Sequence, residues 1–205
     1  MTEDILEQLV DNYFKRREGT FSKHNVKYRP NISRMNNTDK KKYSVHSDID
    51  VLCVDQIKKE AFAISCKSWQ SGFDCKYYLE NLKDQKKMEV VKHGRAIWKN
   101  LREITNPIWA EAFREKIKTE CRTTKYTFII AVTKLKNEEY KEAFENCPEF
   151  IKVITNSGKF KIKIKFLTLK EIIETISAEE QNTAVESSEI ARLIQLLKAA
   201  NMKIN

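Results

Sequence analysis

The stretches 47–54 (SDIDVLCV) and 61–67 (AFAISCK) decide the fold predicted for this chain. Each is a short, mostly apolar run, and only a polar turn separates them, which is the pattern of two neighbouring strands. A third run, 126–132 (YTFIIAV), is the strongest signal for a buried strand. Together with the helical patterns around them, these strands predict an α/β fold with a central mixed sheet flanked by helices.

Side chains alternate between the two faces of a strand, so the pattern also predicts which residues share a face. In the first strand, Asp48 and Asp50 are expected on one face. In the second strand, Ser65 and Lys67 are expected together, opposite Phe62, Ile64 and Cys66. The hairpin is therefore expected to present acids and a lysine from adjacent strands.

The rest of the chain alternates between helical and extended patterns. Apolar spacing predicts helices at 4–17, 76–93, 95–121 (interrupted near Asn106-Pro107), 137–146 and 169–176. Residues 20–45 suggest a strand and a mobile loop, and lysines alternating with apolar residues predict a strand at 159–167. These segments form one predicted domain, 1–176, followed by a polar linker, 177–187, and a C-terminal tail, 188–205, with a helix at 189–200.

Composition narrows the functional classes. The chain has 205 residues, enough for one domain with a real core. Its net charge of +9 favours a polyanionic partner such as DNA or RNA, although a lysine-rich composition can also reflect genome bias. No stretch approaches the roughly 20 apolar residues needed to cross a bilayer, and the acidic N-terminus does not resemble a signal peptide. We therefore expect a soluble, cytoplasmic protein without a membrane partner.

The cysteines are odd in number and scattered. None of the five forms a CxxC pair, which argues against a disulfide framework and against a structural zinc site. Reduced, mostly buried thiols are expected at Cys53, Cys66, Cys75, Cys121 and Cys147.

An acid and a lysine on adjacent strands suit phosphodiester hydrolysis. A divalent metal polarises the phosphate and lowers the pKa of an attacking water, and hard cations such as Mg²⁺ prefer carboxylate oxygens. A nearby lysine can orient the water or stabilise the charge that develops on the phosphate. Asp50 and Lys67 would bring these groups to one scissile phosphate.

The same residues carry a family resemblance. Asp50 in SDIDVL, followed by Ile64-Ser65-Cys66-Lys67, resembles the PD-(D/E)xK nuclease superfamily, which includes restriction endonucleases and Holliday-junction resolvases. Asp50 matches the first acid of that motif, and Lys67 matches its lysine. The resemblance covers roughly residues 1–176. It implies a restriction endonuclease-like fold and a DNA endonuclease that uses Mg²⁺, with Mn²⁺ as an alternative.

The sequence departs from the motif at one position. Two residues before the lysine stands Ser65, where the motif has an acid or glutamine. One restriction-enzyme branch has Ser-x-Lys and places the missing acid on the following helix, which makes Glu80 the candidate second metal ligand. Glu7, on the first helix, matches the helix-borne acid of resolvase-like members, with Glu3 as its competitor. The resemblance also implies that the backbone carbonyl of Cys66 helps Asp50 and Glu80 to bind the metal.

Several residues are candidates for nucleic-acid contact, each with a structural alternative. Trp69 and Gln70 follow Lys67 and could meet DNA near the cut, although a loop tryptophan can equally seal the core. His46 could contact phosphate or act as a base, or simply lie at the surface. The lysine row that includes Lys161 and Lys163 could track a phosphate backbone or protect a sheet edge from aggregation.

Two functional classes follow. The first is a metal-dependent DNA endonuclease of the restriction, repair or defence type, and a homodimer would allow cuts on both strands. The alternative is a protein that keeps the nuclease fold, has lost catalysis through Ser65, and binds nucleic acid or serves as a subunit of a larger complex. RNA is the weaker alternative substrate. Cleavage by the native chain, compared with variants at Asp50 and Lys67, separates the two classes.

Overall fold

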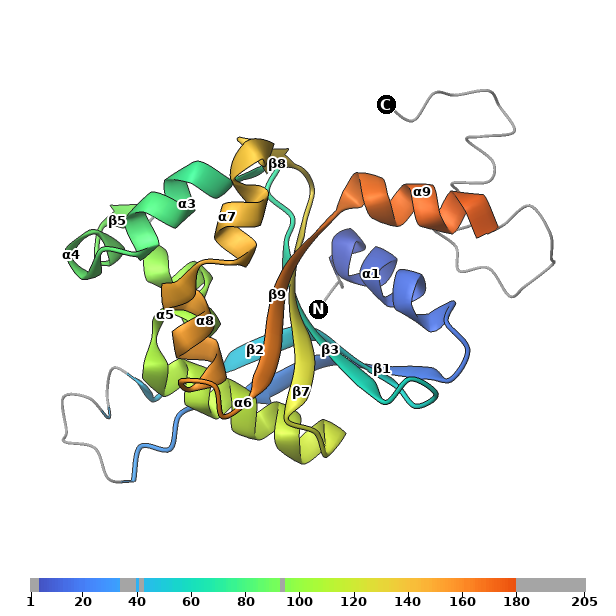
Figure 1. The fold of residues 1–205 in the computed structure, drawn as a ribbon, viewed down its shortest axis with the longest axis horizontal. Helices are drawn as coiled ribbons and strands as arrows, with labels where there is room; N and C mark the ends of the chain where they lie inside the picture. Colours follow the sequence, from blue (N-terminus) through green and yellow to red (C-terminus); the bar gives the residue numbers. More distant parts are fainter. Residues whose placement is uncertain (1–3, 34–39, 41–42, 93–94, 180–205) are drawn as a thin grey trace.

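A five-stranded mixed sheet forms the centre of the molecule (Figure 1). A computed structural model describes residues 4–33, 40, 43–92 and 95–179. The strand order is β1-β2-β3-β7-β9, in which β1 pairs antiparallel with β2 and β2 with β3, whereas β3, β7 and β9 run parallel. The strands are β1 (Thr20–Tyr28), β2 (Ser47–Asp55), β3 (Glu60–Lys67), β7 (Lys125–Val132) and β9 (Lys161–Thr168). The predicted α/β class with a central mixed sheet is confirmed.

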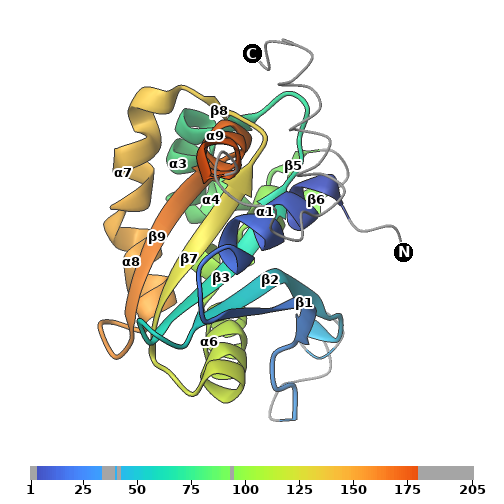
Figure 2. The same cartoon turned by 90° about the vertical axis from the view of Figure 1, so that its right-hand side faces the viewer.

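Helices cover both faces of this sheet (Figures 1 and 2). One face carries the smaller apolar cluster, to which α1 (Ile5–Lys15) and α9 (Leu169–Glu179) contribute. The other face carries the larger cluster, which is built with α3 (Cys75–Leu82), α5 (Arg102–Thr105), α6 (Pro107–Cys121), α7 (Lys141–Glu145) and α8 (Pro148–Thr155). Because the sheet is covered on both sides, β7 is apolar on both of its faces, as a buried parallel strand should be.

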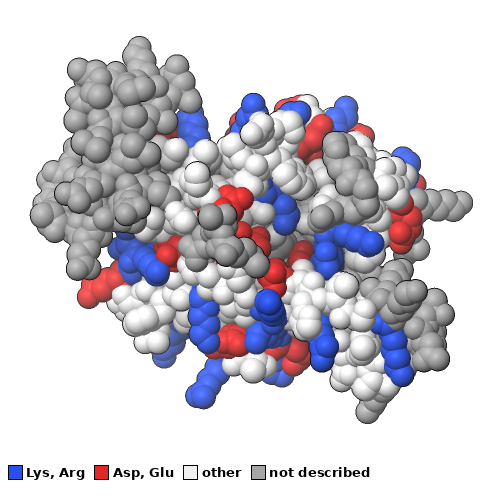
Figure 3. All heavy atoms as spheres, turned by 180° about the vertical axis from the view of Figure 1, so that it is seen from behind, with Lys and Arg blue, Asp and Glu red and all other residues white. Residues whose placement is uncertain are grey.

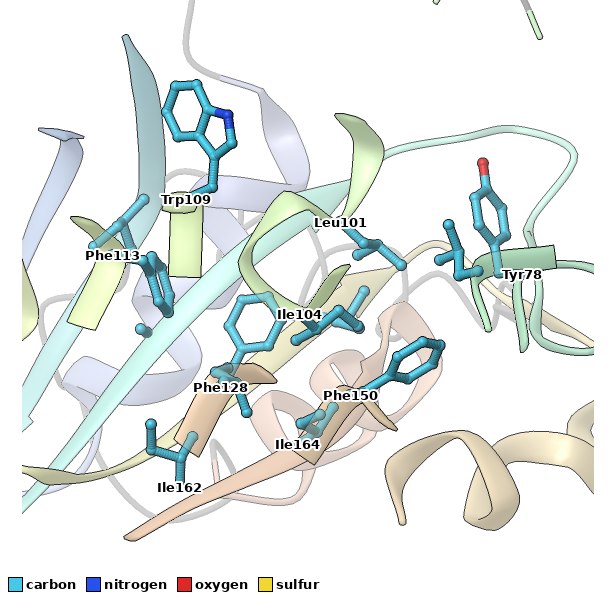
Figure 4. Packing of buried hydrophobic residues seen from close by; sticks show 14 of the residues in the cluster. Tyr78, Leu101, Ile104, Trp109, Phe113, Phe128, Phe150, Ile162 and Ile164 are labelled. Carbon is cyan, nitrogen blue, oxygen red and sulfur yellow. The ribbon is translucent and has the colours of Figure 1, made fainter. Parts of the chain in front are cut away.

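Large side chains fill the space between the sheet and the helices of the larger cluster (Figure 4). Trp109 and Phe113 of α6 are both 1% exposed, and they pack against the β1 residue Tyr28 with ring centroids 5.9 and 5.4 Å away. Phe128 of β7 lies 5.4 Å from the Phe113 ring. This packing places α6 beneath the end of β1, next to the predicted site hairpin.

The long helix predicted at 76–93 is wrong beyond Leu82. The chain instead forms the single turn α4 (Gln85–Met88) and the short strand β5 (Val91–Lys92), which pairs with β6 (Arg95–Ala96). Val90 is 50% exposed, so it does not continue the buried stripe of α3 that the helical spacing suggested.

The helix predicted at 95–121 is also divided. After β6 come the 3-10 turn η1 (Ile97–Asn100), then α5, and then α6. The predicted break near Asn106-Pro107 is confirmed: Pro107 occupies the first helical turn, and the Asn106 side chain accepts hydrogen bonds from the Ile108 and Trp109 N–H groups at 3.1 and 3.3 Å.

The C-terminal half follows the prediction with additions. The predicted short helix at 137–146 is the 3-10 turn η2 (Glu138–Tyr140) followed by α7, whereas α8 was not predicted, and neither was the pair of short strands β4 (Phe73–Asp74) and β8 (Leu135–Lys136). α9 begins after Thr168, which shares a capping box with Glu171, and extends into the predicted linker as far as Glu179. The remaining linker and the predicted helix 189–200 lie outside the described residues.

Two further expectations concern the thiols and the membrane. All five cysteines are unpaired, with Cys53, Cys75 and Cys147 buried and the other two half-buried, as expected for reduced thiols. Among the residues described, no helix combines the length and the apolarity needed to cross a bilayer.

Candidate active site

The β2–β3 pair separates at Asp50. The ladder of paired residues runs from Asp55↔Glu60 to Val51↔Ile64 and stops there, so that the next pair would be Asp50 opposite Ser65. In place of a ladder bond, the Asp50 carboxylate reaches across and its Oδ2 accepts a hydrogen bond from the Cys66 N–H at 2.6 Å. The side chain of Asp50 thus bridges the two strands where the sheet opens.

The alternation of β2 shifts phase at the same point. Ile49 and Leu52 both contribute to the larger cluster, although they are three residues apart and strict alternation would put them on opposite faces. Val51 and Cys53 contribute to the smaller cluster. Opposite this shift, Asn25 of β1 has a φ of 51°, in the left-handed region. The β1–β2 ribbon therefore twists at Asp50, which directs its two ends to different faces.

Ser65 lies beside both the acid and the lysine. The Lys67 ammonium donates a 2.7 Å hydrogen bond to Ser65 Oγ, and both Ser65 and Lys67 act on the pKa of the Asp50 carboxyl. Ser65 is only 7% exposed, and Phe62 and Ile64 pack into the cluster on the opposite face of β3. The predicted sharing of a face by Ser65 and Lys67 is therefore confirmed.

Burial dominates the electrostatics of Asp50. Desolvation raises the pKa of this carboxyl above its usual value, although the charge of Lys67 and the hydrogen bonds from Cys66 and Ser65 act in the opposite direction. Asp48, which is exposed, adds a small repulsion. The environment of Asp50 thus disfavours the ionised form of its carboxyl group.

This environment predicts that Asp50→Asn stabilises the fold at neutral pH. The folded-state pKa lies above the unfolded one, so the native protein loses stability as pH rises through that window, and asparagine resembles the protonated form without titrating. Thermal unfolding should show a midpoint a few degrees higher for the variant at pH 7. The difference should shrink as the pH falls toward 3.8, the ordinary pKa of aspartate. A variant that is less stable than the native protein at pH 7 would contradict this reading.

Glu7 and Glu80, the two candidates for a second carboxylate, occupy different environments. Glu7 is on α1, which packs over the face of β3 that carries Cys66. After burial and Asp50, the charge of Glu7 is the next cause that raises the pKa of the Cys66 thiol; Asp4 raises it further, whereas Lys67 lowers it. Glu80 is exposed on α3, whose buried residues are Cys75, Tyr78, Leu79 and Leu82. Glu7 thus acts on Cys66, whose N–H binds Asp50, although α1 covers the face of β3 opposite Ser65 and Lys67. Glu3 lies outside the described residues.

The acids at this end of β3 provide donors of the kind that Mg²⁺ takes. Asp50 Oδ2 receives one hydrogen bond, and an ionised carboxylate has further lone pairs available. Within the described part of the chain, no three His, Cys, Asp or Glu side chains are grouped closely enough to hold a metal. Mg²⁺ is commonly held by one or two carboxylates together with waters and substrate phosphates. Asp50 with one further acid fits that mode.

Trp69 belongs to the core. Its ring stacks on Phe73 with centroids 5.7 Å apart and an interplanar angle of 5°, and on Tyr78 at 5.7 Å and 23°. The structure thus shows the core-sealing alternative for this tryptophan. Gln70 and His46 are exposed, and His46 lies beyond the start of β2, at the end of a groove between β1 and α6.

The β9 lysines lie far from Asp50. Lys161 and Lys163 are exposed on β9, which forms the edge of the sheet opposite β1. Three strand spacings, together roughly 14 Å, separate β9 from β2. Because Ile162 and Ile164 pack into the larger cluster, these lysines project from the other face, away from the face of Ser65. Lys165 forms a 2.6 Å ion pair with Glu145, which also accepts the Phe166 N–H. The row therefore fits protection of a sheet edge.

Comparisons with known proteins add no functional name. No family model matches the chain, and no curated protein sequence matches it. Among solved structures, it is similar to a crystal structure described as a protein of unknown function, with a TM-score of 0.38 and 14% sequence identity over 97% of this chain and 79% of that one.

Proposed function

We propose that this protein is a metal-dependent endonuclease that hydrolyses DNA, as a variant of the PD-(D/E)xK type. The observation that carries the proposal is the opening of the β2–β3 pair, where the Asp50 carboxylate binds the Cys66 N–H and the Lys67 ammonium binds Ser65 Oγ beside it. A half-buried carboxylate beside an ammonium group suits metal-dependent phosphodiester hydrolysis. The restriction endonuclease-like relationship and a cytoplasmic location belong to the same proposal.

The side chains have separate roles in this proposal. Lys67 holds its ammonium group near the Asp50 carboxyl, since it binds Ser65 Oγ and its charge acts on the pKa of that carboxyl. There it would donate hydrogen bonds to the attacking water or to the phosphate oxygens, whose negative charge grows in the transition state. Ser65 takes the position of the usual second acid and serves to orient Lys67.

Asp50 and Glu7 would hold the cation, with the Cys66 carbonyl as an additional donor. A bound Mg²⁺ or Mn²⁺ supplies a Lewis acid for the phosphate and lowers the pKa of a coordinated water. Glu80 stays a candidate in place of Glu7, although its exposure on α3 speaks against it.

One observation favours the second class, a nucleic-acid-binding protein without catalysis. Ser65 provides a hydroxyl that Lys67 already occupies, where the family motif has a carboxylate. If no second acid joins Asp50, the fold would bind DNA or serve a larger complex without cutting. RNA as the substrate and a homodimer as the active form remain predictions.

The proposal is tested by incubating supercoiled plasmid with the native protein and Mg²⁺ or Mn²⁺. Cleavage that requires the metal and disappears in Asp50→Asn is the expected result. Binding without cleavage under either metal would support the second class, and cleavage that survives in Asp50→Asn would remove the assigned site.

The second carboxylate is identified by a matched pair of variants. We expect Glu7→Gln to lower the cleavage rate at least about tenfold, since even outer groups of a metal site cost that much, and Glu80→Gln to stay within about twofold of native. Titration of Mn²⁺ by calorimetry gives a readout that does not depend on turnover, and Glu7→Gln should weaken that binding. The reverse ranking would assign the role to Glu80.

A further inference from the structure

A groove of about 970 Å³ lies between the end of β1 and α6, apart from the bridge at Asp50. Its β side consists of residues 27–31, Ser33 and His46, and its helical side consists of α6 residues between Ile108 and Thr119. Tyr28, Pro30, Ile108 and Ala112 supply an apolar part, and polar groups rim it. The groove is a concave surface formed by two elements that the core packing holds together.

Cationic side chains reach this groove from three segments. Lys27 and Arg29 come from β1 and the residue after it, His46 precedes β2, and Lys116 comes from α6. In the part of the chain that the structure describes, neither Lys27 nor Arg29 has an acid within ion-pair distance, and both are exposed.

Two acids, Glu111 and Glu115, also line the groove on α6. Glu115 lies 3.9 Å from Lys118, and Glu120, one turn further, is bound by both Lys116 and Lys23 at 2.7 Å. Lysines therefore offset part of the acidic charge of this helix, which leaves Lys27 and Arg29 as the cations available to a ligand.

Strand pairing connects the groove to the proposed active site. Lys27 pairs with Asp48 across the β1–β2 ribbon, two residues from Asp50. Standard strand dimensions put the Cα atoms of Lys27 and Asp50 roughly 8–9 Å apart, which is roughly the axial length of two or three phosphates on one strand of duplex DNA.

Charge is dispersed over the described part of the face seen in Figure 3. Figure 3, which shows the molecule from behind, has Lys and Arg side chains interspersed with Asp and Glu over the described face. The net charge of +9 is therefore not concentrated in one patch on that face. A local site for a polyanion has to be sought in concave places lined by cations, and the β1–α6 groove is one.

We infer that the β1–α6 groove holds the phosphate backbone of the nucleic acid next to the phosphate cut at Asp50, with Lys27 and Arg29 as its phosphate contacts. This inference rests on the proposed function. Exposed lysine and arginine side chains suit non-specific phosphate contact, which positions a substrate without reading its sequence. The apolar part of the groove then lies beside the sugars of the same DNA strand.

The test measures binding in the Asp50→Asn protein, so that cleavage does not interfere. A fluorescent DNA duplex is titrated at several salt concentrations, and its anisotropy gives the affinity. Against this parent, Lys27→Gln with Arg29→Gln removes two charges from the groove. Lys58→Gln with Lys59→Gln removes two exposed charges from the β2–β3 turn, and Lys161→Gln with Lys163→Gln removes two from β9. Thermal melts confirm that each variant is folded.

The groove variant should bind at least about tenfold more weakly at low salt, and its slope of log affinity against log salt should be shallower by about 2, because two phosphate contacts are lost. The turn and β9 variants should retain the parental slope. A groove variant with parental affinity and slope overturns the inference, and a β9 variant that shows the loss instead assigns the contact to β9.

The outcomes separate this inference from the proposed function. Native protein that cuts DNA while the groove variant binds normally retains the endonuclease and rejects the groove. Native protein that binds DNA through the groove without cutting rejects the endonuclease and supports the groove. A chain that does not bind the duplex at any salt concentration rejects both.

Discussion

Replacing Lys67 by methionine is expected to reduce metal-dependent DNA cleavage by at least about 100-fold, the loss typical of removing one group that stabilises transition-state charge. Methionine has a similar length and no charge, so the change removes the hydrogen-bond donor that binds Ser65 Oγ at 2.7 Å. Single-turnover nicking of supercoiled plasmid measures the chemical step directly. The melting temperature should stay close to native, because the Lys67 side chain is half-exposed.

Two further variants define what the lysine contributes. Lys58→Met, an exposed lysine in the β2–β3 turn, removes the same charge from the same hairpin and should cut at the native rate. Lys67→Arg keeps the charge in a planar group of different reach, and it should recover only part of the activity. If Lys67→Met cleaves as fast as Lys58→Met, then Lys67 has no role in the chemistry.

Replacing Phe73 by alanine is expected to lower the free energy of unfolding by about 3–5 kcal/mol, the range for a large-to-small change in a core. Phe73 is completely buried and lies at the centre of an aromatic cluster. Its ring centroid is 4.7–5.7 Å from those of Trp69, Tyr78, Phe144 and Phe166. The loss would loosen the packing of α3 and α7 against the end of the sheet. Equilibrium urea unfolding measures the change.

Phe21→Ala is the matched control for this prediction. Phe21 is 62% exposed on β1, and surface substitutions of this kind usually change stability by less than about 0.5 kcal/mol. A Phe73→Ala protein with near-native stability would show that the cluster can collapse around the missing ring. It would also reopen a role for Trp69 outside the core.

Local pattern was sufficient to predict the hairpin and the class of the fold. The alternation in 61–67 predicts that Ser65 and Lys67 share a face, and the structure agrees, because side-chain direction along a strand follows from backbone geometry alone. The buried strand at 126–132 and the helix break at Pro107 were predicted for similar local reasons. These signals involve residues close together in the chain.

The same reasoning failed between residues 83 and 101. Helical spacing of apolar residues extended past Leu82, yet the chain turns into short elements whose exposed Val90 and Val91 lie outside the core. Periodicity does not reveal which apolar residues find a partner, because that depends on distant elements. For this reason the sequence left two roles open for Trp69, contact with DNA or packing in the core. In the structure its ring stacks on Phe73 and Tyr78.

The sequence by itself identified Asp50, Ser65 and Lys67 and the hairpin that carries them, because strand alternation is a property of neighbouring residues. Only the tertiary structure decided how they meet. The end of the ladder at Val51↔Ile64 lets the Asp50 carboxylate reach the Cys66 N–H, and α1 packs over the face of β3 that carries Cys66. Both depend on contacts between segments far apart in the chain, where burial and the separation of charges are set by packing.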